Sequence, residues 1–335
     1  SSTCWSICFM WLLIPACGCR PEMRASSSEN GLPSRWQQII DSDLFYSFVR
    51  SPMVMVAALL SLVFLVAALF APLVAPSDPF DMASIDLMDS LIGPVWLHGG
   101  EWRFILGTDD QGRDMLSAII YGARISLLVG FASVIAAMVL GVTVGLIAGY
   151  AGGWIDSLLM RIADIQLSFP AILIALLIDG VARTMLGHAA SESVAFSVLI
   201  IAIALSFWVQ YARTVRGSVL VERGKEYVQA AQVIGLPSWQ IVFRHILPNV
   251  LGPVLVIATI QLALAVITEA TLSFLGVGVP PTSPSLGTLI RIGNEYLFSG
   301  EWWITIFPGA ALVILVLAVN LLGDWLRDAL NPKLR

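Results

Sequence analysis

Long apolar runs separated by short charged connections dominate the chain. A bilayer core about 30 Å thick is crossed by about 20 apolar residues in a helix. Five runs meet this requirement: Met53 to Val74, Ile125 to Tyr150, Ser193 to Tyr211, Val250 to Thr268 and Trp302 to Gly323. A sixth, Leu158 to Ile178, is required for a consistent topology, although Pro170 lies in its middle. The pattern predicts an all-α membrane protein with six transmembrane helices.

Composition supports this class and excludes others. Of the 335 residues, 58% are hydrophobic and 12% are charged, against about 25% charged in soluble domains. A net charge of -5 leaves no basic face for nucleic acid. Because the four cysteines all lie within the first 19 residues, the membrane part has no thiolate metal site or disulfide.

The distribution of Lys and Arg predicts the orientation, because these residues accumulate in cytoplasmic loops. With the amino terminus inside, five basic residues fall outside, Arg161 lies in a span and twelve fall inside: Arg20, Arg24, Arg35, Arg50, Arg213, Arg216, Arg223, Lys225, Arg244, Arg327, Lys333 and Arg335. Both termini are therefore expected in the cytoplasm. Segment 75–123 carries eight acids, from Asp78 to Asp114, and is expected outside.

The chain is expected to divide around these spans. Residues 1–35 match no functional pattern and are expected to be a disordered extension. Residues 36–50 have apolar positions at helical spacing, which predicts an amphipathic helix in the membrane interface. The first transmembrane helix is expected at 51–74, the transmembrane core at 124–324 and a cytoplasmic tail at 325–335.

The longest inside connection, residues 212–249, is the most informative segment. A first helix is expected to end at Gly235, since glycine adopts the left-handed conformation that closes a helix. Pro237 suits the first turn of a second helix, which is expected to end at Pro248. Trp239 and Phe243 on an exposed helix indicate a partner with an apolar groove.

Spaced residues in this loop match a known family. Gln229-Ala230-Ala231, three residues, Gly235, nine residues and His245-Ile246-Leu247-Pro248 resemble the signature loop of permease subunits of binding-protein-dependent ABC importers. Gln229 replaces the family's acid, and His245 replaces an isoleucine. Segments 107–127, 269–281 and 320–332 resemble the C-type subunits of dipeptide and oligopeptide permeases.

The resemblance implies a type I importer permease (MetI-like) fold in the bacterial inner membrane. It implies a second permease subunit, two ATPase subunits that hold ATP and Mg, an extracytoplasmic substrate-binding protein and peptide cargo. The loop would then be the coupling helix that docks on the ATPase. Its expected contact residues are Gln229, Ala230, Ala231, Gly235, Leu236, Pro237, Ser238, Trp239, Phe243, Arg244, Leu247 and Pro248.

Other marked residues have structural and functional interpretations. Gly141, Gly145 and Gly149 recur every four residues and predict a flat helix face for packing. Arg161 and Asp164 are spaced to form a structural ion pair. Glu269, an acid in a membrane span, is a candidate for the transport pathway or for gating, as is Phe274; a structural capping role for Glu269 stays open.

The sequence lacks the motifs of ATP-hydrolysing and other hydrolytic proteins. No phosphate-binding loop, HExxH or Gly-x-Ser-x-Gly sequence is present, so this chain is expected to be a non-catalytic subunit that leaves ATP hydrolysis to its partners. The three histidines are too scattered to form a metal site. Two alternatives stay open: an importer of nickel, glutathione or another small solute, and an ion-coupled secondary transporter or channel.

Overall fold

Proline, glycine or a capping side chain lies at the end of several helices in this protein. The structure is a computed structural model that describes residue 48 and residues 50–80, 86–186, 192–279 and 283–330. Residues 46–335 form one unit. The predicted extension and nearly all of the predicted interfacial helix lie outside the described residues.

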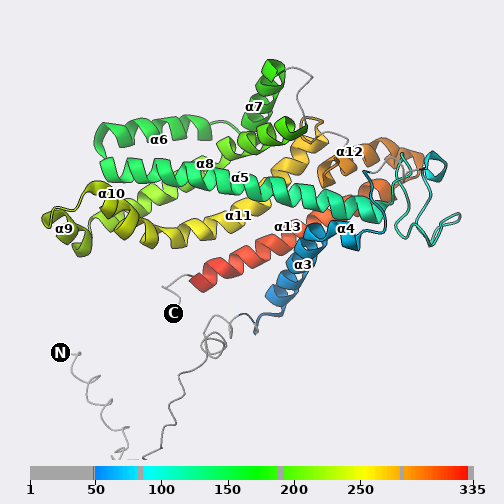
Figure 1. The fold of residues 1–335 in the computed structure, drawn as a ribbon, viewed down its shortest axis with the longest axis horizontal. Coiled ribbons are helices and arrows are strands. Elements are labelled where there is room, and N and C mark those ends of the chain that lie inside the picture. The colour runs from blue at the N-terminus through cyan, green and yellow to red at the C-terminus, as the bar shows by residue number, and fades with distance from the viewer. Residues whose placement is uncertain (1–47, 49, 81–85, 187–191, 280–282, 331–335) are drawn as a thin grey trace, which may run out of the picture. The chain divides into compact units, whose positions relative to one another are not determined.

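Helices account for most of the described chain (Figure 1). In chain order they are α3 (Pro52–Leu69), α4 (Ala71–Val74), η1 (Leu87–Asp89), α5 (Met115–Ala151), α6 (Gly153–Leu167), α7 (Ala171–Leu186), α8 (Glu192–Arg223), α9 (Glu226–Val233), α10 (Ser238–Gln240), η2 (Ile241–Ile246), α11 (Leu247–Phe274), α12 (Leu286–Tyr296), η3 (Leu297–Ser299) and α13 (Trp303–Leu330). The η2 segment is a π-helix.

Five of the six predicted spans are single helices in the structure, and the sixth is a bent pair of helices. In the described part of the chain, five helical segments are long and apolar enough to cross a membrane. The sixth candidate is a pair, α6 and α7, bent by 94°. Pro170 at the bend lacks an N–H and disfavours a helical conformation at the preceding residue. The predicted sixth span, Leu158 to Ile178, therefore corresponds to a helix pair that is bent at Pro170.

The longest helix, α5, organises the fold. Its 37 residues span about 55 Å, so the helix extends beyond a bilayer core of about 30 Å. Asp114 caps its start by accepting a hydrogen bond from the Ser117 backbone N–H at 2.8 Å. Gly152, with φ of +66°, ends it.

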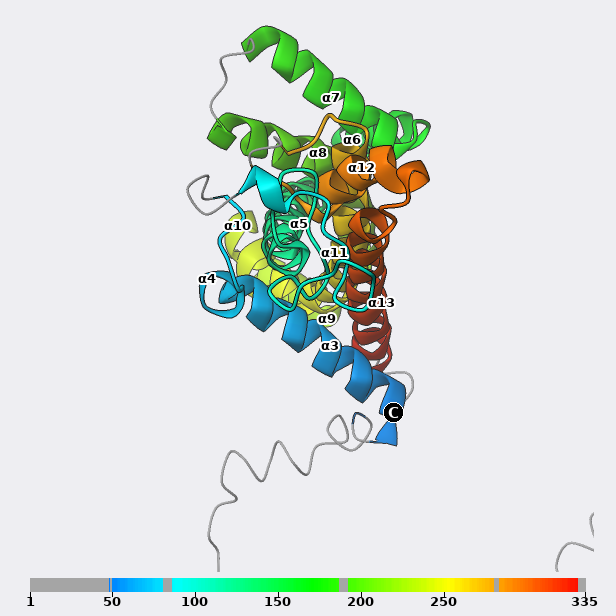
Figure 2. The same cartoon turned by 90° about the vertical axis from the view of Figure 1, so that its right-hand side faces the viewer.

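Close packing of α5 on α8 forms the centre of the unit. A Cβ atom on Gly141 would lie 2.4 Å from the Trp208 carbonyl oxygen, and one on Gly145 would lie 2.6 Å from that of Ala212. A Cβ atom on Gly149 would lie 2.8 Å from the Val219 Cβ. The three glycines therefore lie where α8 approaches the α5 backbone. On another side of α5, α3 and α13 lie side by side (Figure 2).

Candidate functional site

The segment between α8 and α11 is built around a glycine turn. Helix α8 continues to Arg223, so the first part of the predicted loop 212–249 is helical. After α9, Gly235 has φ of +83°, and the Leu236 N–H donates to the Ala231 carbonyl at 3.1 Å. The short helix α10 follows. The predicted turn at Gly235 thus lies between two helices, which Figure 1 shows at one end of the unit.

The helix after this turn does not end at Pro248, contrary to prediction. A helical segment runs through α10, η2 and α11, from Ser238 to Phe274. Pro248 lies in the first turn of α11, where its missing N–H is tolerated. The wider π-turn immediately before it gives the proline ring room. The segment after the turn is therefore continuous with a membrane-spanning helix.

Both sides of the turn expose large apolar side chains. Val233 and Ile234 are 88% and 77% exposed, and Trp239 and Phe243 are 64% and 60% exposed. The other predicted contact residues vary in exposure: Ala231 is buried, Leu236 and Leu247 are half-buried, and Gln229, Ala230, Gly235, Pro237, Ser238, Arg244 and Pro248 are exposed. We call residues 226–243 the docking segment, since an apolar surface at a helix turn is suited to a protein partner.

A polar network that the sequence analysis missed holds the docking segment in place. The Tyr227 hydroxyl donates to the Glu222 carboxylate and accepts from Asn249 Nδ2 at 3.0 Å. Asn249 also donates to the His245 carbonyl oxygen at 2.8 Å. Lys225 Nζ lies 2.6 Å from Glu222 Oε1. The network connects α8, α9 and α11.

The Glu222 carboxylate influences the pKa values of the other groups in this network. Its hydrogen bond to the ammonium group raises the pKa of Lys225. Burial, followed by the hydrogen bond to Glu222, raises the pKa of the Tyr227 hydroxyl. Lys225 therefore stays charged and Tyr227 stays neutral near pH 7, which preserves the donor pattern.

Glu269 lies inside the helix packing. The residue is fully buried and accepts hydrogen bonds from Ser126 on α5 and Ser273 on α11, both at 2.7 Å. Ser126 Oγ also accepts from the Leu286 N–H at the start of α12, at 3.4 Å. Glu269 therefore joins α5 and α11 beside the start of α12. Phe274, the other candidate, is 39% exposed at the end of α11.

The predicted pairing of Arg161 with Asp164 is wrong. Asp164 instead forms an ion pair with Arg213 of α8, and Asp156 pairs in the same way with Arg216. Gln166 accepts from Trp208 Nε1 at 2.7 Å. Asp156, Asp164 and Gln166 all lie on the α6 face that meets α8. Packing of α6 on α8 therefore gives Asp164 a partner on α8 and leaves Arg161 exposed.

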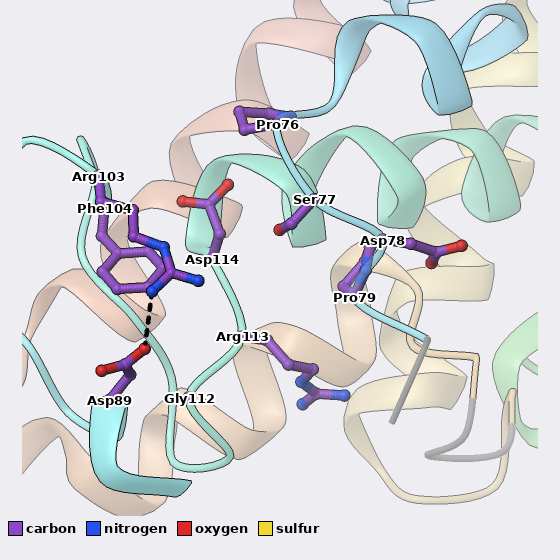
Figure 3. A pocket seen from close by; sticks show the side chains of 10 residues that line it. All are labelled: Pro76, Ser77, Asp78, Pro79, Asp89, Arg103, Phe104, Gly112, Arg113 and Asp114. Carbon is purple, nitrogen blue, oxygen red and sulfur yellow. Dashed lines mark hydrogen bonds and ion pairs between the residues drawn. The ribbon is translucent and has the colours of Figure 1, made fainter. Parts of the chain in front are cut away.

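Most acids of the segment before α5 have local partners. Asp89 pairs with Arg103 at 3.3 Å beside a small polar pocket (Figure 3). The Arg113 guanidinium points away from that pair in Figure 3 and binds Asp109 at 2.6 Å in a buried ion pair. Burial, and then the neighbouring Asp109, raise the pKa of Asp110.

No metal centre accompanies these features in the described part of the chain, where no group of three His, Cys, Asp or Glu residues could hold a metal ion.

Family comparison identifies the fold. The family model described as "Binding-protein-dependent transport system inner membrane component" matches residues 141–335. The chain belongs to this family of transport permeases. The model for the N-terminal transmembrane domain of oligopeptide transport permease C matches residues 34–94. The matched region of the permease family contains the docking segment, Glu269 and the three glycines Gly141, Gly145 and Gly149 of α5.

Individual relatives of this permease cover most of the chain. The di/tripeptide transport system permease protein DppC of Pseudomonas aeruginosa is 39% identical over 293 residues, which are 88% of this chain and 92% of that protein. The glutathione transport system permease protein GsiD of Pectobacterium atrosepticum is 36% identical over 288 residues, 86% of this chain and 89% of that protein.

A solved structure shares the permease fold. A chain of the MetNI methionine ABC transporter, in an inward-facing conformation, aligns with a TM-score of 0.50 at 25% identity and covers 65% of this chain and 98% of that chain. The predicted type I importer permease (MetI-like) fold is thereby confirmed.

Proposed function

We propose that this permease is the non-catalytic transmembrane subunit of an ATP-driven peptide importer, and that its docking segment couples it to ATPase subunits. The exposed apolar side chains on both sides of Gly235 carry the proposal. A surface of this kind, fixed to α8 and α11 by the Tyr227 network, would pass a movement of the partner directly to membrane-spanning helices. ATP and Mg would be bound by the two ATPase subunits.

Peptides are the proposed cargo. The di/tripeptide permease relative supports this class. The glutathione permease relative favours a second candidate, since glutathione is itself a small peptide. Uptake of labelled dipeptide, glutathione and nickel by the same reconstituted transporter would separate these cargoes. Faster uptake of nickel than of either peptide would contradict the peptide proposal, and faster uptake of glutathione than of dipeptide would favour the second candidate.

The remaining partners follow from the proposed importer. A second permease subunit would complete the pathway through the membrane, and an extracytoplasmic binding protein would deliver cargo at the side of segment 75–114. The excess of Lys and Arg on the docking-segment side supports placing this segment, and both termini, in the cytoplasm of a bacterium. The proposed location is the inner membrane.

Disrupting the docking surface tests the proposal. The double substitution Trp239→Ala and Phe243→Ala, in a transporter expressed with its ATPase subunits, should abolish ATPase co-purification and ATP-dependent uptake. The matched control is Leu173→Ala with Leu177→Ala on α7, which removes two apolar side chains that are 56% and 67% exposed. Unchanged ATPase retention in the Trp239 and Phe243 variant would contradict the proposal. Uptake that persists without any ATPase would favour the secondary transporter or channel.

A further inference from the structure

An apolar groove lies between α3, α5, α11 and α13. Its volume is about 500 Å³, and leucines contribute much of its lining, including Leu65 on α3, Leu127 on α5, Leu262 on α11 and Leu322 on α13. The close approach of Gly323 to Thr259, where an added Cβ would lie 2.9 Å from the threonine hydroxyl, holds α13 against α11. The groove therefore lies beside a close contact between α11 and α13.

One cation lines this groove. Arg124 is exposed, and no described residue forms an ion pair or hydrogen bond with its guanidinium. It is the α5 lining residue nearest the start of that helix. The apolar run of α5 begins at the next residue, Ile125. Arg124 therefore lies at the boundary where the hydrocarbon core of the membrane gives way to the polar layer.

The apolar lining extends into the membrane from this boundary. The start of α13 lies beside the loop before α5, because Trp303 Nε1 donates to the Thr108 carbonyl at 3.2 Å. The two helices therefore run in the same direction away from that end. On α13 the lining extends from Leu315 to Leu326, which covers about 16 Å along a helix axis. A ligand with its charge at Arg124 would have its remaining length against apolar side chains.

These features fit an amphiphile with one anionic end. A peptide in the groove would place its backbone amides against leucine side chains, where unsatisfied polar groups are costly. A hydrocarbon chain has no such groups, and a phosphate at the membrane boundary complements the Arg124 guanidinium. We propose that the groove binds the acyl chain of an anionic phospholipid whose phosphate is held by Arg124.

Lipid retention by the purified full chain tests this site. Native mass spectrometry in detergent would compare added phosphatidylglycerol, which is anionic, with phosphatidylcholine, whose phosphate charge is balanced by its own choline cation. A basic residue near the membrane surface contributes enough attraction for an anionic lipid to change retention about fivefold. Phosphatidylglycerol should therefore be retained about fivefold better than phosphatidylcholine. Arg124→Gln should remove this preference, and Arg124→Lys should keep most of it.

Two further variants separate the headgroup from the groove. Ala68→Trp, at a buried lining position of α3, should fill the groove and lower the retention of both lipids. Arg161→Gln removes an exposed arginine outside the groove and should change neither. Equal retention of the two lipids by the unmodified chain would overturn the proposal, and this comparison needs no variant to fold. Protection of a Leu128→Cys thiol by the second permease subunit, without lipid, would also overturn it by assigning the groove to a protein partner.

Discussion

Tyr227 and Asn249, 22 residues apart in the sequence, are joined by a hydrogen bond of 3.0 Å that ties α9 to the first turn of α11. The same tyrosine hydroxyl donates to Glu222 near the end of α8. One side chain therefore connects the docking segment to two membrane-spanning helices. A rigid connection of this kind is what a coupling element needs, because a loose one would absorb the partner's movement.

Removing the Tyr227 hydroxyl should loosen this connection. Tyr227→Phe removes one of two donors to the 9% exposed Glu222 and leaves Lys225 as the other. A hydrogen bond to a charged group contributes about 1.5–3 kcal/mol. We expect ATPase subunits to co-purify normally while the amount of peptide transported per ATP hydrolysed falls several-fold. The measurement is paired uptake and phosphate release in proteoliposomes.

A matched tyrosine provides the control for that variant. The Tyr150 hydroxyl forms no hydrogen bond with a described residue, although its carbonyl accepts from Arg223. Tyr150→Phe should therefore preserve the transport-to-hydrolysis ratio. If Tyr227→Phe preserved that ratio as well, the network would serve only to stabilise the fold.

Backbone conformation, and not space, should limit substitution at Gly235. Its φ is +83°, and a Cβ atom added there would have no neighbouring atom within 4 Å. Gly235→Val should abolish transport but preserve membrane insertion, because a left-handed conformation costs a non-glycine residue about 1–2 kcal/mol and more when it is β-branched. Gly235→Asn should retain most activity, since asparagine tolerates this conformation. Equal activity of the Val and Asn variants in an uptake assay would refute the conformational explanation.

Features set by local sequence could be predicted, whereas contacts between residues far apart in the sequence could not. The turn at Gly235 and the apolar runs were predictable because local backbone chemistry and hydropathy determine them. The Arg213 partner of Asp164 lies 49 residues away, and sequence spacing instead favoured Arg161. The continuation past Pro248 was missed because a π-turn accommodates the proline. Tyr227 carried no signal, since its partners come from helices that meet only in the folded chain.

Glu269 should contribute mainly to the stability of the folded protein. Its carboxylate accepts from Ser126 and Ser273 in a fully buried site. Glu269→Leu leaves two buried hydroxyls without this acceptor, at a cost of about 1–3 kcal/mol each. We expect a fall in Tm of at least about 5 °C in detergent, measured by intrinsic fluorescence. Glu269→Gln keeps an acceptor oxygen and should lose less. An unchanged Tm with lost uptake would instead assign Glu269 to the transport pathway.

The glycine face of α5 should not tolerate larger side chains. A Cβ on Gly145 would lie 2.6 Å from the Ala212 carbonyl oxygen and 2.7 Å from Val215 Cβ, so Gly145→Leu must separate α5 from α8. Overpacking of this kind costs about 1–3 kcal/mol or more, and we expect lower yield and lower Tm. Gly180→Leu on α7 is the control, because no atom lies within 4 Å of its Cβ position. Equal losses at the two positions would show that helix propensity, and not packing, sets the effect.

The acids before α5 should divide into two functional groups. Asp78 and Asp86 are exposed, whereas Asp109 is buried in its ion pair with Arg113. If the binding protein docks on this side, neutralising both exposed acids with Asp78→Asn and Asp86→Asn should lower the association rate of that protein. The salt dependence of the rate should also become flatter, because exposed charges act mainly on the encounter of the two proteins. Asparagine keeps an oxygen that can accept from the Phe80 and Met88 N–H groups, which the two carboxylates now bind at 3.0 Å. Asp109→Asn should lower Tm, because it leaves a buried guanidinium without its counter-charge. Surface plasmon resonance at two ionic strengths measures the first effect, and an unchanged rate and salt slope would assign the exposed acids to solvation of the segment.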